Sequence, residues 1–505
     1  MMLMTDDVGI AGVVVKMSRF SWHAVGSNSS GALGVGDSAD RYTLVPCLSA
    51  ASRAVCVVAG GRHSIFLRGP CDASVSCILC DGGGACDGAA PLIAGTWRGG
   101  DGGGERATDD GYGGGGSARG IPKVSAALAR VRITTAAAGW EHALLVDAGG
   151  GIWALGAGRY GRLGLGGSGD VATPTRLELP DGARADAVAA GGAHSLAVDA
   201  EGRLWAGGRG QGGGGGDAMT PLLKSCAFAP AATRWSAAPG GLAAGRSHSL
   251  VVSTCGRLAA WGSDADGQTS GRGGGKRGRL APRSAVLEIM WVVRGKDKDD
   301  DDVDGLPLTD VVAVAAGWSF SLVLCQYGAV YAWGRSEMGQ CGRSEIGQCG
   351  SGGGDGGRLP LPLPLPLPLP LPTFIPDSAT LVSRSSPIGP RLSLPCDCPA
   401  AFSSSAAAAA GTSPPPCAAR AIVAGAESAA ALMTCGALVA WGWNEHGNCP
   451  NVYCPPKATA TATATALAAA PFVPPGVAVK ATRGTRAVAA AGASLFVLCN
   501  NDDEE

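Results

Sequence analysis

Two short apolar arms alternate along this chain, and their alternation constrains the fold more than any other feature. The first arm is marked by Ala-Gly, often followed by His-Ser after two intervening residues. The second arm is marked by Trp followed by Gly or Ala-Gly. In the best-preserved copy, residues 185–208, a turn at 199–202 joins the two arms into a β-hairpin. One hairpin cannot bury its own apolar face, so the copies must pack against one another.

The order of the arms indicates how the copies are arranged. The first arms are centred on Gly60, Gly139, Gly191, Gly245, Gly317, Gly425 and Gly492. The second arms contain Trp22, Trp153, Trp205, Trp261, Trp333 and Trp441, and the copy expected after Gly60 falls at 76–80, without a Trp. The series starts with a Trp arm and ends with an Ala-Gly arm, so these two unpaired arms complete one another. We therefore predict an all-β fold, a seven-bladed β-propeller closed by pairing of the N- and C-terminal arms.

Such a propeller would use most of the 505 residues as a single domain. We expect a leader at 1–18, the propeller at 19–499 and an acidic tail at 500–505. Stretches rich in Gly and Asp, in Leu-Pro pairs or in Ala-Thr pairs interrupt the repeats and are expected to be loop insertions. These insertions span about 81–120, 271–305, 351–416 and 457–475.

Charge and targeting signals argue against several classes of partner. The formal net charge is −1, so no overall field attracts nucleic acid or an anionic membrane. No apolar run is long enough to span a bilayer, and the first residues lack the features of a signal or transit peptide. We expect a cytoplasmic, possibly nuclear, monomer with reduced thiols and without membrane insertion.

Recurrent residues in the arms are interpreted as structural. His63, His142, His194 and His248 occupy one place in the repeat, which favours a hydrogen-bonding role over metal binding or catalysis. Phe320, Ser428 and Leu495 stand where His is usual. The tryptophans of the second arms are interpreted as packing residues: Trp153, Trp205, Trp261, Trp333 and Trp441.

The sequence carries no convincing catalytic or metal site. Cys71, Cys77, Cys80 and Cys86 leave a zinc site as an alternative, although zinc sites more often use two short cysteine pairs. Cys449 and Cys454 with His446 form a weaker candidate. No nucleophile elbow, paired carboxylates or zinc-protease motif is present. We expect no catalytic residues, no metal and no cofactor.

One connecting loop is a candidate binding site. Trp443, Asn444, Glu445 and His446 form a bulky polar-aromatic tetrad between two glycines, and such side chains on a propeller face suit a partner protein. The alternative is that the asparagine simply caps a turn.

With both arms in view, the chain resembles the regulator of chromosome condensation family, whose repeats carry Ala-Gly-x-x-His-Ser and Trp-Gly-x-Asn-x-x-Gly-Gln-Leu-Gly. The matching pieces are SWHAVGSNSSGALGVGD, AAGWEHALLV, WGRSEMGQCGR and WGWNEHGNC. Within the family the likeness is greatest to members that act in secretion as guanine nucleotide exchange factors. Ultraviolet photoreceptors of the family use Gly-Trp-Arg-His-Thr repeats, which Trp140 and Trp318 approach without the Arg.

The resemblance implies a propeller that binds a small GTPase and acts as a guanine nucleotide exchange factor. Such a protein performs no covalent chemistry, because it works by binding the nucleotide-free GTPase more tightly. The alternative is an interaction scaffold for another protein partner, without exchange activity.

Overall fold

The computed structural model describes the repeated part of the chain. The described residues are 20–48, 54, 56–67, 91–96, 123–124, 126–129, 131–209, 220–221, 234–269, 287–288, 290–291, 306–307, 310–326, 328–341, 418–449, 472–473 and 485–500. Their regular secondary structure is almost entirely β-strand, with three short 3-10 turns at Ala126–Leu128, Arg159–Gly161 and Pro180–Gly182. No described helix is long and apolar enough to cross a membrane.

The described strands form seven antiparallel sheets of three or four strands and one two-stranded sheet. In the terminal sheet, both ends of the repeated region meet: β1 (Phe20–Gly26), β2 (Arg41–Pro46), β28 (Ala487–Ala491) and β29 (Ser494–Asn500). The second sheet contains β3 (Cys56–Ala59), β4 (His63–Leu67), β5 (Leu92–Gly95) and β6 (Lys123–Val124). The third contains β7 (Ile133–Ala138), β8 (His142–Asp147), β9 (Ile152–Gly156) and β10 (Val171–Leu177). The fourth contains β11 (Ala185–Ala190), β12 (His194–Asp199), β13 (Leu204–Gly208) and β14 (Thr220–Pro221). The fifth sheet contains β15 (Leu242–Ala244), β16 (His248–Val252), β17 (Leu258–Gly262) and β18 (Leu287–Glu288). The sixth contains β21 (Val311–Ala316), β22 (Phe320–Cys325) and β23 (Val330–Gly334). The seventh contains β24 (Ala419–Ala424), β25 (Ser428–Met433), β26 (Leu438–Trp443) and β27 (Phe472–Val473). The two-stranded sheet pairs β19 (Met290–Trp291) with β20 (Leu306–Pro307).

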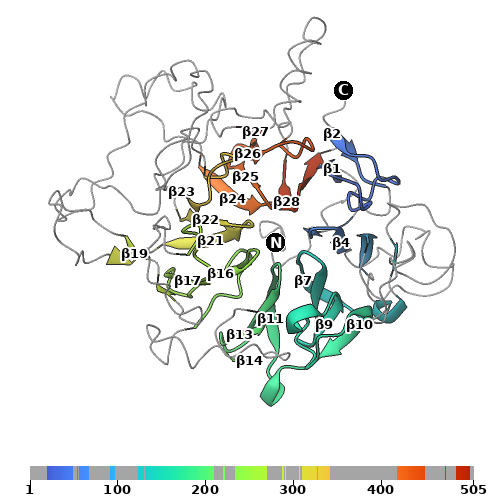
Figure 1. The fold of residues 1–505 in the computed structure, drawn as a ribbon, viewed down its shortest axis with the longest axis vertical. Coiled ribbons are helices and arrows are strands. Elements are labelled where there is room, and N and C mark those ends of the chain that lie inside the picture. Colours follow the sequence, from blue (N-terminus) through green and yellow to red (C-terminus); the bar gives the residue numbers. More distant parts are fainter. Residues whose placement is uncertain are drawn as a thin grey trace, which may run out of the picture.

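The sheets are arranged around a common centre, as Figure 1 shows. The first strand of each sheet contacts the first strand of the next sheet along the chain, and β28 in turn contacts β3. Apolar clusters fill the space between neighbouring sheets; one of them packs Trp22, Phe66 and Phe496 from the terminal and β3–β6 sheets. Radial antiparallel sheets packed face to face around an axis are the architecture of a β-propeller. The expected all-β propeller class is thus confirmed.

The expected pairing of the two chain ends is also observed. Strand β1 lies between β2 and β29, and it pairs with β29 from Phe20 opposite Asn500 to Gly26 opposite Ser494. The register places Ser494, and not Leu495 as we expected, at the position that His occupies in other sheets. The reason is a shorter turn at Gly492, whose φ of 55° is left-handed.

Each Ala-Gly arm is two strands rather than one, which corrects the hairpin derived from the sequence. In 185–208, β11 and β12 form a hairpin around Gly191, and β13 is a third strand. A strand-terminal glycine is a more constant landmark than Trp: Gly156, Gly208, Gly262, Gly334 and Gly442 have φ values between 96° and 105°. At Gly262 a Cβ atom would lie 2.5 Å from the carbonyl oxygen of Ser247, so only glycine fits. Trp261 directly precedes this glycine, whereas Trp205 lies three residues before Gly208.

Parts of the expected insertions belong to sheets. Strand β5 lies within 81–120 and takes the place we had assigned to 76–80, because its Gly95 pairs with His63 as Gly156 pairs with His142. Strands β18 and β27 fall within 271–305 and 457–475, and each adds to the outer edge of a sheet. The leader at 1–18, residues 76–80, 351–416 and 501–505 lie outside the described residues.

Candidate partner-binding face

One face of the propeller is built from two sets of connections, which we call the loop face. The turn between the first and second strands of each sheet meets the loop that follows the third strand. A repeated backbone hydrogen bond connects the two: the residue after the positive-φ glycine near the end of the third strand donates its N–H to the carbonyl just before the second strand. Its members are Ser27–Ala493, Thr96–Arg62, Ala157–Glu141, Arg209–Ala193, Ser263–Ser247, Arg335–Ser319 and Trp443–Glu427, with N···O distances of 2.8 to 3.1 Å.

Five loops on this face share one backbone design. In each, a glycine with positive φ donates its N–H to the carbonyl three residues earlier: Gly31–Asn28, Gly161–Gly158, Gly267–Asp264, Gly339–Ser336 and Gly447–Asn444. The residues just before the glycine form the tip, and their chemistry differs between loops. One tip is Arg159–Tyr160, whereas the others include Asp266, Glu337 and Glu445, all three exposed. A constant backbone therefore presents variable side chains.

The structure divides the candidate tetrad into different environments. Trp443 is the last residue of β26 and half-buried, so it is not outside the sheet as we expected. Asn444 is 2% exposed, and its Oδ1 accepts the N–H of Cys449 at 2.7 Å, as Asn28 accepts that of Leu33 at 2.9 Å. Asn444 therefore caps its turn.

The other two members of the tetrad reach the surface. Glu445 is exposed, and half-buried His446 lies 2.8 Å from Asp40 across the boundary with the terminal sheet. The ring of His446 also packs edge-on against Trp443, with 5.3 Å between the centroids. Glu445 and the exposed edges of Trp443 and His446 are what this loop offers a partner.

The repeated histidines link neighbouring sheets. The Nε2 atoms of His142, His194 and His248 lie 2.8, 3.0 and 3.0 Å from hydroxyls of the following sheet, those of Ser195, Ser249 and Ser321. All four histidines, His63 included, are fully buried. Burial lowers the pKa of His63 and of His194 to about 3, and that of His248 to about 4. These neutral imidazoles are placed as structural groups between sheets, away from the surface.

The tryptophans of the third strands donate hydrogen bonds either within their own sheet or to the preceding sheet. Trp153 and Trp205 donate their indole N–H to the carboxylates of Asp147 and Asp199 in the preceding turn, at 2.9 and 2.8 Å. Trp333 and Trp441 instead donate to the carbonyls of Gln268 and Gln340 in the loop of the preceding sheet, at 2.9 and 2.8 Å. Trp261 is 1% exposed and packs in the cluster between the β11–β14 and β15–β18 sheets.

A pocket opens at the centre of the loop face, on the axis of the ring. The glycine turns of the first strands line it, together with Trp140, Arg246 and Trp318. The rings of Trp140 and Trp318 come from non-adjacent sheets and meet with centroids 5.0 Å apart. The side chain of Arg246 is exposed, and its Cζ lies 5.0 Å from the Trp318 ring. Aromatic side chains and an arginine thus occupy the middle of this face.

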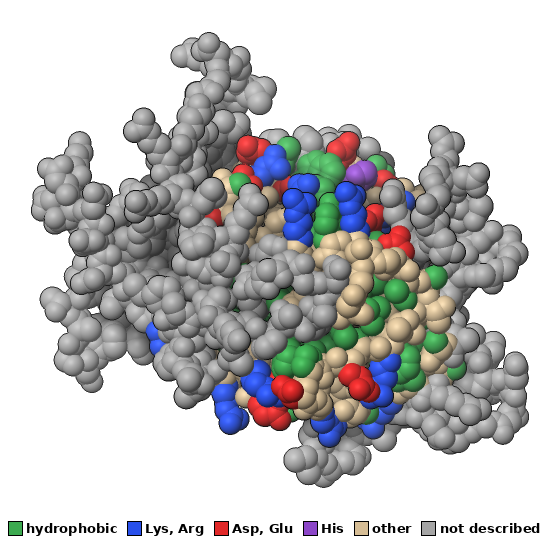
Figure 2. Space-filling model, turned by 60° about the horizontal axis from the view of Figure 1, so that its bottom comes forward, with side chains coloured by type: hydrophobic (Ala, Val, Ile, Leu, Met, Phe, Trp, Pro, Cys, Tyr) green, Lys and Arg blue, Asp and Glu red, His purple; other side chains and the backbone are tan. Residues whose placement is uncertain are grey.

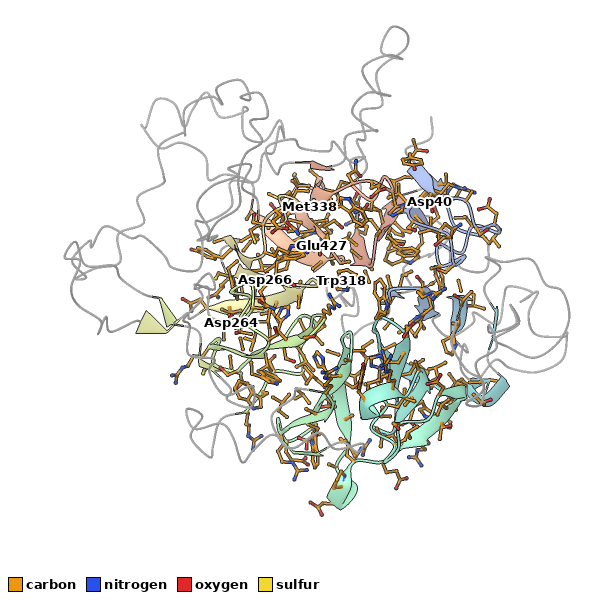
Figure 3. The ribbon with its side chains drawn as sticks, in the orientation of Figure 1. Asp40, Asp264, Asp266, Trp318, Met338 and Glu427 are labelled. Carbon is orange, nitrogen blue, oxygen red and sulfur yellow. The ribbon has the colours of Figure 1, made fainter. Side chains whose placement is uncertain are left out.

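Acidic side chains occupy a sector beside this pocket. Figure 3 shows Asp264, Asp266, Met338 and Glu427 on neighbouring loops. Burial raises the pKa of Glu427, which accepts a short hydrogen bond from Gln340 and lies 3.5 Å from Arg335. Figure 2 shows Lys and Arg next to Asp and Glu among the described side chains of the visible surface, rather than a field of one sign.

Only some of the candidate metal ligands belong to the described residues. Cys71, Cys77, Cys80, Cys86 and Cys454 lie outside the described residues. Cys449 is buried, and burial raises the pKa of its thiol. Among the described residues, no group of three or more His, Cys, Asp or Glu side chains has the geometry to hold a metal ion.

Two segments of the chain match the regulator of chromosome condensation (RCC1) repeat, residues 149–198 and 311–340. The chain is 29% identical over 222 residues to the ultraviolet-B receptor UVR8 of Arabidopsis thaliana, covering 44% of this chain and 45% of that protein. It is 28% identical over 242 residues to human E3 ubiquitin-protein ligase HERC2, covering 48% of this chain and 4% of the ligase. It is 23% identical over 218 residues to the secretion-regulating guanine nucleotide exchange factor of Bos taurus, covering 41% and 42%. The match thus spans less than half of each of these relatives.

Solved structures share the fold at low sequence identity. Human WBSCR16 superposes with a TM-score of 0.59 at 15% identity, covering 95% of this chain and 99% of that structure. Prp20p of Saccharomyces cerevisiae, described with its binding to Gsp1p and histones, superposes with a TM-score of 0.57 at 15% identity, covering 97% and 96%. This chain therefore contains RCC1 repeats, folds as an RCC1-like β-propeller and has guanine nucleotide exchange factors among its distant homologues.

Proposed function

We propose that this protein is a binding module that uses its loop face to engage a small GTPase and promote release of the bound guanine nucleotide. The observation that carries the proposal is the set of five loops with one backbone design and different exposed tips, because a rigid frame with variable tips suits recognition of a protein surface. The distant likeness to the secretion-regulating exchange factor supports the choice of partner. We further propose that the seven sheets are the blades of one closed ring, monomeric and located in the cytoplasm or nucleus.

Exchange needs no covalent step. The loop face must bind the nucleotide-free GTPase more tightly than the nucleotide-bound form, and the difference in binding free energy lowers the affinity for nucleotide by the same amount. Tight binding that does not distinguish these two forms would make the protein a scaffold. The likeness to UVR8 and HERC2, whose names describe other activities, keeps the scaffold as the alternative.

The deciding measurement is release of a fluorescent guanine nucleotide from a panel of small GTPases at increasing concentration of this protein. An exchange factor accelerates release from at least one GTPase in proportion to its concentration. If no GTPase responds and captured partners bind equally with and without nucleotide, the scaffold is the correct function.

The tetrad loop provides the first variant. Trp443→Ala with Glu445→Ala should weaken capture of the nucleotide-free GTPase by about thirtyfold, the effect of losing a central aromatic contact, while the melting temperature stays close to that of the wild type. Glu201→Ala, an exposed residue in a turn between second and third strands at the opposite face, is the matched control and should leave capture unchanged. Equal capture by wild type and double variant would remove this loop from the interface.

A further inference from the structure

Three arginines on one half of the loop face lie against aromatic rings instead of carboxylates. The Cζ atoms of Arg159 and Arg209 lie 4.7 and 5.0 Å from the centroid of the same ring, that of Tyr160. Arg246 lies 5.0 Å from the ring of Trp318. Within the described part of the chain, none of the three has an ion-pair contact with Asp or Glu. We call these five residues the cationic patch.

The arginines of the patch belong to three neighbouring sheets, and one turn connects those of the second and third sheets. Ala193 accepts the backbone N–H of Arg209 at 3.0 Å. The neighbouring Gly192 donates its N–H to Gly245, and a Cβ atom on Gly192 would lie 2.6 Å from the carbonyl oxygen of Arg246. The turn 192–193 therefore lies between Arg209 and Arg246, and both side chains are exposed beside it.

Three other arginines of the same face, Arg335, Arg41 and Arg162, have acidic partners. Arg335 pairs with Glu337 and lies 3.5 Å from Glu427, and Arg41 pairs with Asp37. Arg162, directly behind the patch, is 4% exposed, donates to Gly192 at 2.8 Å and lies 3.6 Å from Glu141. Among the described residues, no Asp or Glu forms an ion pair with the arginines of the patch; exposed Arg62, on the turn between β3 and β4, is a further positive charge of this face without such a pair.

Tyr160 holds an unusual backbone conformation at the tip of its loop. Its φ is 69°, and the next residue, Gly161, is also left-handed. A non-glycine residue in this region costs on the order of 1 kcal/mol and persists where surrounding contacts demand it. The residue is 36% exposed, and its ring lies against the side chains of Arg159 and Arg209. The strained residue therefore fixes the two guanidinium groups in place before any partner arrives.

We infer that the cationic patch docks an acidic segment of a protein partner, rich in Asp or Glu. A guanidinium stacked on a ring keeps its edge N–H groups available, and their planar fork matches a carboxylate with two hydrogen bonds. Immobilised arginines lose little further conformational entropy on binding.

A protein segment fits better than nucleic acid. A duplex extending past the patch would bring its phosphates against the acidic sector, where Asp266 and Glu337 stand on the next loops around the ring. A short acidic segment covers only the arginines. The inference rests on the proposed function in using the same face, but it requires no GTPase.

The test is direct binding of a short fluorescein-labelled peptide in which Glu alternates with Gly, followed by anisotropy at low and at physiological salt. Arg159→Gln with Arg209→Gln should weaken binding by about tenfold or more. Tyr160→Gly removes the ring but tolerates the positive φ, so it should weaken binding without lowering the melting temperature. Arg132→Gln with Arg184→Gln removes two exposed charges from the rim of the opposite face and is the matched control.

Each outcome of this experiment either supports the inference or overturns it. Weaker binding in both patch variants, with the control unchanged, supports the inference. Equal loss in the patch and control pairs would show attraction by net charge alone and overturn it. Tighter binding of a labelled DNA duplex than of the peptide, through the same arginines, would replace the protein segment with nucleic acid. Because no GTPase is present, a negative exchange assay leaves this result intact, and failure of the peptide to bind leaves exchange untouched.

Discussion

The sheets on one side of the ring are linked by His–Ser hydrogen bonds, whereas on the other side the histidine is replaced and different contacts link the sheets. On the first side, His142, His194 and His248 reach hydroxyls of the following sheets. On the second side, Phe320 and Ser428 stand at the same register position.

The replacement of His by Phe shows what this position requires. A Cβ atom on Gly317 would lie 1.9 Å from Phe320 Cε1, and one on Gly245 would lie 2.2 Å from His248 Cε1. Both rings therefore fill the same space under the glycine turn. The repeat needs a flat ring or a small group there, and the hydrogen bond is an addition that only some sheets use.

The largest effect is expected from the second side, where the terminal sheet joins both ends of the repeated region. Removing residues 18–37 deletes β1 with its buried Trp22 and Val25, and leaves β29 without a partner on one edge. We expect loss of cooperative thermal unfolding for the whole propeller, because each sheet is stabilised by its neighbours. Removing 359–410, a stretch outside the described residues, should be nearly harmless. A truncated chain lacking 18–37 that melts like the wild type would show that the ring does not depend on this sheet.

The second effect concerns the histidine side and pH. The pKa of His194 falls from its ordinary 6.5 to about 3 in the folded protein, so between these values the unfolded chain binds a proton that the folded one does not. The contribution of this neutral histidine to the free energy of unfolding is therefore fully present above pH 6.5 and decreases as the pH falls. The expected loss at pH 5 is about 2 kcal/mol for one such histidine. Denaturant midpoints between pH 7 and pH 5 would measure it. A flat profile would mean that the imidazoles accept protons in the folded state.

Removing a single His–Ser hydrogen bond should lower the stability of the protein by less than acidification does. Ser195→Ala removes the hydroxyl that meets His142 and that donates to the carbonyl of Arg162 at 2.6 Å. Two buried polar groups lose a partner, so the free energy of unfolding should fall by about 1–3 kcal/mol. Ser247→Ala, at an exposed site on the next turn, is the control and should change stability by less than about 0.5 kcal/mol. Equal effects of the two variants would show that the His–Ser contact contributes nothing specific.

The smallest effect on stability is expected when a histidine of the first side is replaced by the phenylalanine found on the second side. His248→Phe places at this position the residue that nature uses at 320, and Ser321 keeps its hydrogen bond to Gln268 at 2.8 Å. Stability at pH 7 should change by about 1 kcal/mol or less, while the contribution of this histidine to acid sensitivity disappears. A loss several times larger would indicate that the two sides are not interchangeable in shape.

Much of the architecture could be predicted from the repeats, because packing dictates the same residue at the same place in each sheet. The arms, the structural histidines and the joining of the chain ends all rest on this periodicity. The third strand of the β3–β6 sheet could not be located by spacing, since it follows Gly60 by far more residues than usual. The glycine landmark offered a better signal: Gly139 to Gly156 and Gly317 to Gly334 are both separated by 17 positions, whether or not Trp adjoins the second glycine.

The candidate site was less predictable. The bulky side chains of the tetrad suggest a binding loop, yet Asn444 caps its own turn and Trp443 belongs to a strand. The cationic patch had no motif, because Tyr160, Arg209 and Arg246 are brought together by the turns of three different sheets. Such a site depends on contacts between repeats, which a pattern within one repeat does not encode.

The terminal sheet also imposes a delay during synthesis of the protein, because its strands come from both ends of the repeated region. His23 pairs with Val497, so β1 emerges from the ribosome long before its partner strand exists. At typical translation rates of about 5–20 residues per second, the wait is roughly half a minute to a minute and a half. During that time β1 exposes an unpaired edge and its apolar Trp22 to solvent. Of the described strands, β1 waits longest for its partner and is therefore the most vulnerable to aggregation, and a chaperone that covers β1 until release would act at the step that completes the ring.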